Sequence, residues 1–176
     1  MKTITINTYG INELEGAARE RALSWLAAGT EYPWHHENVD SLKAFLEAFG
    51  LRIRDVSYEY GGRGSHCTLK QSIVWENDEG ETITGQELAD RLSGMFDLSG
   101  NGPFTGYCMD ETLLDGIRAF IKKPDDSTSI QEIVAGCLED WASACNADYE
   151  ATFTEEALIE FAECNDYQFD EDGRIV

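Results

Sequence analysis

Three histidines and one cysteine are the side chains of this sequence best suited to bind a metal or to act in catalysis. His35 and His36 are adjacent, and His66 is followed directly by Cys67. Imidazole and thiolate are preferred zinc ligands, but neither pair has the usual ligand spacing, and adjacent residues seldom bind one metal together. We therefore predict no metal site. A small metal-dependent or thiol enzyme using these four residues remains the alternative.

A second pattern matches the first half of a calcium-binding loop. Asp97, Ser99, Asn101 and Gly102 occupy its first, third, fifth and sixth positions. The twelfth position, which should supply a bidentate glutamate, is Cys108, so we interpret the segment as an Asn-Gly turn. No nucleophile elbow, HExxH motif or phosphate-binding loop is present in the sequence. We predict no catalytic residue and no cofactor, and hence a protein that is not an enzyme.

The five cysteines are odd in number and contain no CxxC pair. This pattern favours reduced, buried thiols, and Cys137 and Cys145 are expected in the core. No apolar run approaches the roughly 20 residues that span a bilayer, and the first residues lack the apolar segment of a signal peptide. The expected location is the cytoplasm, without membrane contact.

Acidic residues dominate the composition and are concentrated toward the C-terminus. The formal net charge is −21, from 34 acidic and 13 basic residues. No Lys or Arg occurs in the 50 residues between Lys123 and Arg174, which hold 15 acidic residues. Such a field argues against direct binding to nucleic acid and favours a basic partner. The oligomeric state is left open.

Two predicted C-terminal helices carry carboxylates opposite their apolar faces. Residues three or four apart on a helix lie about 5–6 Å from each other, a scale comparable with successive phosphates of a nucleic-acid strand. A solvated face of an acidic protein is the plain alternative. The predicted partner-binding face comprises Glu132, Glu139, Asp140, Glu156, Glu160, Glu163, Asp170, Glu171 and Asp172.

Hydrophobic periodicity and capping signals predict a single α+β domain over residues 1–176, with an acidic helical portion at about 125–172. About six helices should pack on a small, mainly antiparallel sheet. The helices are expected to begin near Asn12, Asp40, Thr84, Asp110, Ser129 and Thr154, the fifth being the longest. The strands are expected at Thr3–Thr8, Leu51–Tyr60, His66–Trp75 and Phe104–Met109, with a closing hairpin at the C-terminus.

Two intervening segments are expected to be loops. The proline-containing segment Glu31–Asn38 should connect the first two helices. The glycine-rich residues 61–65 should join two strands of a hairpin. The apolar helical faces predict a core that contains Trp25, Phe45, Leu46, Leu92, Phe120, Trp141 and Phe161.

The two ends of the chain resemble a group of known proteins. The segments TITINTYGINELEGAARERALSWL and YQFDEDGRIV are similar to the opening and closing segments of small uncharacterised proteins encoded by bacteriophages and prophages. The resemblance carries over no catalytic residue. By analogy with acidic anti-CRISPR and antirestriction proteins, it implies an inhibitor located in the cytoplasm of the host cell.

Charge and resemblance together give the functional hypothesis. We expect an inhibitor of a host defence complex whose acidic surface competes with DNA or RNA for a basic nucleic-acid-binding protein. The small enzyme on His35, His36, His66 and Cys67 is one alternative. An acidic structural or accessory protein is the other.

Overall fold

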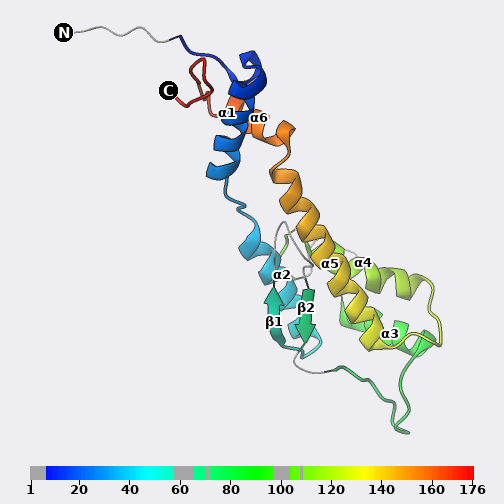
Figure 1. The fold of residues 1–176 in the computed structure, drawn as a ribbon. Helices are drawn as coiled ribbons and strands as arrows, with labels where there is room; N and C mark the ends of the chain where they lie inside the picture. Colours follow the sequence, from blue (N-terminus) through cyan, green and yellow to red (C-terminus); the bar gives the residue numbers. More distant parts are fainter. Residues whose placement is uncertain (1–6, 58–65, 70–71, 97–103, 108) are drawn as a thin grey trace. The chain divides into compact units, whose positions relative to one another are not determined.

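The computed structural model describes residues 7–57, 66–69, 72–96, 104–107 and 109–176 (Figure 1). In this part of the chain the fold is built mainly from α-helices. Their bounds are α1 Gly16–Gly29, α2 His35–Ala48, α3 Gly85–Met95, α4 Met109–Lys122, α5 Ile130–Thr152 and α6 Glu155–Cys164, with a short 3-10 helix, η1, at Ile11–Glu13.

The prediction of an α+β fold is wrong. The only strands in the described ranges are β1, Ile53–Ser57, and β2, His66–Leu69, which pair antiparallel as the predicted hairpin, with a register shift between Ile53 and Asp55. Elsewhere in these ranges, apolar helix faces are covered by other helices and by connecting segments, not by a sheet. Residues 3–6 of the first predicted strand and the loop at 61–65 lie outside the described residues.

Two further segments differ from their predicted secondary structure. The predicted strand Phe104–Met109 is wrong, because residues 104–107 form bends and Met109 is the first residue of α4. The predicted loop Glu31–Asn38 is wrong from His35 onward, where α2 has already begun.

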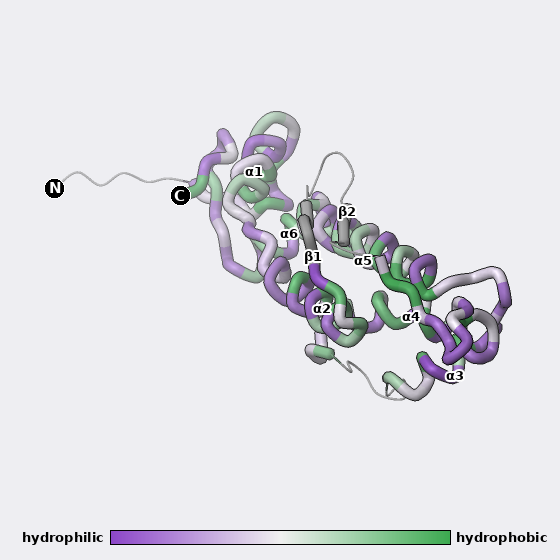
Figure 2. Tube along the Cα trace, turned by 90° about the horizontal axis from the view of Figure 1, so that it is seen from below, coloured by the Kyte–Doolittle hydropathy of each residue, from purple (hydrophilic) through white to green (hydrophobic). Residues whose placement is uncertain are grey.

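The predicted caps of α5 and α6 are confirmed, whereas the helix expected to begin near Asn12 begins at Gly16. Ser129 and Glu132 form the expected reciprocal capping box at the start of α5, and the Thr154 hydroxyl accepts the Ala157 N–H at the start of α6. With 23 residues, α5 is the longest described helix, as predicted. Both hydrophobic and hydrophilic residues occur along this helix (Figure 2).

The chain divides into two compact units. The terminal unit consists of Met1–Tyr32 and Asp148–Val176, and the central unit consists of Pro33–Ala147. The predicted acidic portion at 125–172 is therefore shared between them. The single domain stays a prediction, because a division into compact units does not show whether either folds alone.

The core of the central unit is formed by α2, α3, α4 and α5 together with the segments around Leu51, Ile73 and Ile83. Trp141 and Phe45 are its largest fully buried side chains. Helices α4 and α5 approach closely at Gly116, where an added Cβ would lie 2.7 Å from the Cys137 Sγ. Glycine at this position therefore permits the close helix contact.

The core of the terminal unit is smaller. Helices α1 and α6 lie side by side (Figure 1), and Leu26, Leu158 and Phe169 are buried between them and the C-terminal segment. The Tyr9 and Phe169 backbones exchange two hydrogen bonds of 2.8 and 2.9 Å. The predicted closing hairpin is reduced to an isolated bridge between Phe169 and Ile175.

The core prediction was correct for one group of residues and wrong for another. Five of the predicted core residues are buried: Phe45, Leu46, Leu92, Phe120 and Trp141. Trp25 and Phe161 are instead 41% and 38% exposed. Both lie in the terminal unit, whose two helices and short segments are too few to cover the full width of each apolar stripe. Periodicity identifies the apolar face of a helix but not how much of that face is covered.

Candidate functional site

The nine carboxylates of the predicted binding face are divided between the two compact units. Glu132, Glu139 and Asp140 belong to the central unit. The other six belong to the terminal unit.

Helix α6 presents three of these carboxylates to solvent. Glu156, Glu160 and Glu163 are all exposed, as the predicted outward face requires. Glu163 accepts a 2.5 Å hydrogen bond from the Asn12 side-chain amide. Glu156 and Glu160 pair with no cation among the described residues. Their charges are therefore available to a partner.

The other three residues of the predicted face that belong to the terminal unit, Asp170, Glu171 and Asp172, lie in the turn before the last residues. The Asp170 Oδ1 atom accepts the N–H groups of Asp172 and Arg174, so this carboxylate fixes the turn. Asp172 pairs with Arg174 at 3.0 Å, and both are exposed. Glu171 is exposed. Only part of this group is thus available for binding.

Each cation in the described part of the terminal unit has an acceptor within that unit. Arg19 forms a 2.9 Å ion pair with Glu155, and Arg21 donates to the Asp172 carbonyl oxygen. Together with Arg174 these are all the basic residues in the described part of the unit. The whole unit has 14 acidic and four basic residues, a formal net charge of −10. The larger central unit has 20 and nine, or −11.

A pocket of about 380 Å³ lies between η1 and the end of α6. Its lining includes three acidic residues, Glu13, Glu163 and Asp166, and the aromatic residue Tyr167. We call this the acidic pocket. Glu13 also accepts the Gly10 N–H at 2.7 Å, which stabilises the start of η1. A positively charged group is the ligand that such a lining favours.

In the central unit, the three predicted residues differ in role. The Glu132 carboxylate accepts the backbone N–H and the hydroxyl of Ser129 at 2.8 and 2.7 Å, and these hydrogen bonds lower its pKa. Glu132 therefore serves as a helix cap. Glu139 and Asp140 are exposed on α5 and pair with no described cation.

The four residues of the alternative enzyme lie on two elements of the central unit, α2 and β2. His35 and His36 form the first turn of α2, with ring centroids 5.8 Å apart. His66 and Cys67 lie on β2, opposite Ser57 and Val56 of β1. No cluster of three or more potential metal ligands was found within the described ranges. The partial calcium-loop pattern from Asp97 to Gly102 falls outside those ranges.

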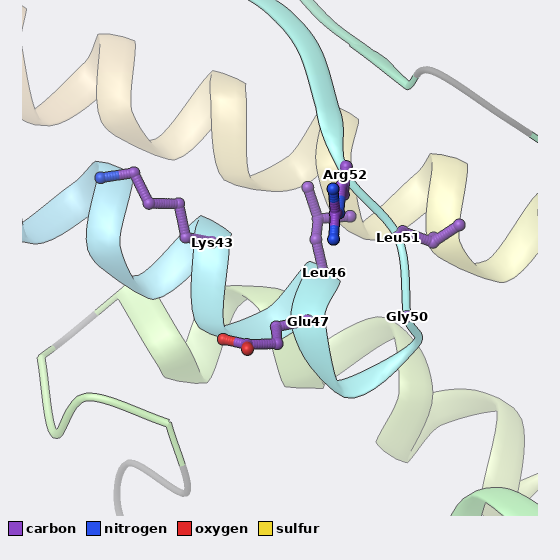
Figure 3. A pocket seen from close by; sticks show the side chains of 6 residues that line it. All are labelled: Lys43, Leu46, Glu47, Gly50, Leu51 and Arg52. Carbon is purple, nitrogen blue, oxygen red and sulfur yellow. The ribbon is translucent and has the colours of Figure 1, made fainter.

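A second pocket, of about 450 Å³, lies at the end of α2 in the central unit (Figure 3). Lys43, Glu47 and Arg52 are its charged residues, and Leu46 and Leu51 supply apolar wall. The Lys43 ammonium pairs with Asp40 at 2.8 Å and points away from Arg52. Because these polar groups do not converge, this pocket lacks the arrangement expected of a catalytic site.

One buried carboxylate was missed by the sequence interpretation. Asp110 has no exposed surface and accepts N–H groups from Thr105 and Gly106 at 2.8 and 2.9 Å. Burial raises its pKa, but hydrogen bonds from Ser41, Thr105 and Gly106 outweigh that effect, and the net pKa is lowered. These donors are supplied by the adjoining loop and by α2, which marks Asp110 as a structural residue. The only sequence signal was its position as a helix-capping aspartate.

Comparison with protein-family models, curated proteins and solved structures finds no match to this chain. Within the described residues, none of the helices has both the length and the apolar character required to cross a membrane.

Proposed function

We propose that this chain is a non-catalytic binding protein that occupies the basic nucleic-acid-binding surface of another protein. The terminal unit is the binding element, and DNA or RNA is the competitor. In its narrower form the partner is a CRISPR or restriction complex, which holds nucleic acid in a positively charged channel. The resemblance of the chain ends to phage-encoded proteins favours this narrower form.

One observation carries the proposal. Each described cation of the terminal unit is held by an internal acceptor, whereas Glu156 and Glu160 are exposed without a described counterion. A surface with this imbalance projects a negative field, which accelerates encounter with a basic surface and repels nucleic acid. The carboxylates then replace phosphates as partners of lysine and arginine.

Direct binding measurements test the proposal. The purified protein is titrated onto an immobilised guide-loaded Cas9-type complex, a restriction enzyme and core histones at about 0.05 M and about 0.2 M salt, a range over which charge-driven binding weakens steeply. We expect binding to at least one of them at low salt, with displacement of a labelled duplex. Absence of low-salt binding to all three, or binding without displacement, would contradict the proposal.

A matched pair of variants locates the surface. The double variant E156Q/E160Q neutralises two exposed carboxylates of the terminal unit, and E139Q/D140N does the same in the central unit. Exposed ion pairs contribute about 0.2–1 kcal/mol each, so the first variant should bind roughly 2- to 30-fold more weakly. The second variant should bind nearly as the wild type does. Equal weakening by both would show that the terminal unit is not the specific binding element.

A further inference from the structure

Three aromatic side chains form a continuous row on the terminal unit. The Trp25 and Tyr167 ring centroids are 5.5 Å apart, and the Tyr167 and Phe161 centroids are 5.8 Å apart, both in edge-to-face geometry. The Trp25 ring also meets the fully buried Phe169 at 6.3 Å. These contacts order the rings while Trp25 and Phe161 remain more than a third exposed. We call Trp25, Tyr167 and Phe161 the aromatic row.

The aromatic row is continuous with the acidic pocket. Tyr167 belongs to both, because it also lines the pocket that contains Glu13, Glu163 and Asp166. The nearest basic residue on α1, Arg21, is one turn before Trp25 and donates its guanidinium to the Asp172 carbonyl oxygen. An exposed aromatic surface therefore adjoins carboxylates, and its neighbouring guanidinium is already bound.

This combination selects the chemistry of a partner. An apolar helix docked here would desolvate nearby carboxylates without supplying a counter-charge, which is unfavourable. A guanidinium is planar, so it can stack on an aromatic ring and donate two hydrogen bonds to a carboxylate. A lysine ammonium is a strongly hydrated point charge and gains less from such a surface. Charge complementarity therefore favours a basic segment over an apolar one, and the planar, weakly hydrated guanidinium favours arginine over lysine.

The central unit contains the same kind of contact within the chain. The Arg91 guanidinium carbon lies 4.4 Å from the Trp75 ring centroid. This is within the distance at which a cation is attracted to the face of an aromatic ring. The fold thus already pairs an exposed arginine with a half-buried tryptophan.

We propose that the aromatic row and the acidic pocket together bind arginine side chains of a basic partner protein. This inference rests on the proposed function and specifies the partner's chemistry. Arginines that contact phosphates in the partner would then contact Trp25, Tyr167 and the pocket carboxylates. The contact distinguishes arginine-rich from lysine-rich surfaces of equal charge.

Two peptides of equal length and charge, one of arginines and one of lysines, test the inference. We expect the wild type to bind both at low salt and to prefer the arginine peptide. Trp25→Leu and Phe161→Leu keep apolar volume but remove an aromatic ring, and each should reduce that preference by about two- to fivefold. Binding of the lysine peptide should be nearly unchanged.

Trp34→Leu is the matched control, because Trp34 is 53% exposed but belongs to the central unit. It should leave the arginine preference intact. Indole N–H resonances provide a readout that does not depend on the folding of a variant. The Trp25 resonance should shift more with the arginine peptide than with the lysine peptide. The Trp34 resonance should show no such difference between the two peptides.

The outcomes separate the inference from the proposed function. Equal, salt-sensitive binding of both peptides, or an arginine preference that survives both row substitutions, would overturn the inference alone. An unshifted Trp25 resonance at saturating arginine peptide would overturn it as well. If neither peptide binds at low salt, the inference and the proposed function are both overturned.

Discussion

The Thr105 backbone N–H donates a 2.8 Å hydrogen bond to the Oδ2 atom of Asp110, and the Thr105 hydroxyl donates a 2.9 Å hydrogen bond to Oδ1. The same hydroxyl lies 2.9 Å from that of Ser41 on α2. The charge of Asp110 thus connects the 104–107 loop, the start of α4 and α2. Replacing it should be costly, because several buried donors would lose a charged acceptor.

We expect Asp110→Asn to lower the free energy of unfolding by about 1–3 kcal/mol. Urea denaturation at neutral pH measures this change, and Asp78→Asn in an exposed turn is the control, which should change stability little. A stability of Asp110→Asn equal to that of the control would show that the charge contributes nothing to the fold.

The lowered pKa of Asp110 also predicts a pH dependence with a definite sign. A carboxyl whose pKa is lower in the folded state stabilises the fold above its unfolded pKa, near pH 4, and loses this contribution as the pH falls through its folded pKa. The stability difference between wild type and Asp110→Asn should be constant from about pH 7 to pH 5 and decrease below about pH 4. A difference that is unchanged in acid would contradict the assignment.

Gly116 should resist substitution despite its position inside a helix. Alanine normally favours a helix interior over glycine by about 1 kcal/mol. Here an added Cβ would lie 2.7 Å from the buried Cys137 Sγ, and overpacking typically costs about 1–3 kcal/mol. Gly116→Ala should therefore destabilise the wild type.

The same substitution should stabilise a Cys137→Ala background, where the sulfur has been removed. A double-mutant cycle in urea measures the coupling between the two positions. Identical effects of Gly116→Ala in both backgrounds would show that the two side chains do not compete for this space.

Gly173 and Gly80 provide a matched comparison for the C-terminal turn. Their φ angles are +78° and +82°, so alanine is strained at either position. Only at Gly173 would the added Cβ also meet a backbone atom, the Ala18 carbonyl oxygen, at 2.0 Å. Thermal unfolding should show a clearly larger loss of stability for Gly173→Ala than for Gly80→Ala. Equal losses would mean that the turn can shift away from α1 at little cost.

Cysteine reactivity should follow burial. Cys164 is exposed, whereas Cys137 and Cys145 are fully buried, and burial raises the pKa of Cys137 to about 12. Because the thiolate is the reactive form, alkylation at about pH 8 should label Cys164 quickly and Cys137 only after denaturation. Peptide mapping by mass spectrometry identifies the labelled residues. Rapid native labelling of Cys137 would require the α4–α5 contact to open frequently.

The starts of α5 and α6 were predictable from the sequence. The Ser129–Glu132 capping box and the Thr154 cap involve residues three apart, so their hydrogen bonds form within one turn and need no distant partner. The segment Phe104–Met109 lacked such a signal. Its aromatic and polar residues suit a strand, but Phe104 packs against Phe45 and Phe96, and Asp110 binds the backbone N–H groups that a sheet would have used.

The candidate binding surface was also predictable only in part. The net charge of −21 follows from composition, and the stretch without Lys or Arg after Lys123 follows from the order of the residues. The availability of each carboxylate depends on the fold: Glu155 is paired with Arg19, 136 residues away, and Glu163 with Asn12, 151 residues away. The exposure of Trp25 and Phe161 was likewise decided by how little of the chain covers them. Charge and periodicity are properties of the sequence, whereas counterions and cover come from residues that only folding brings together.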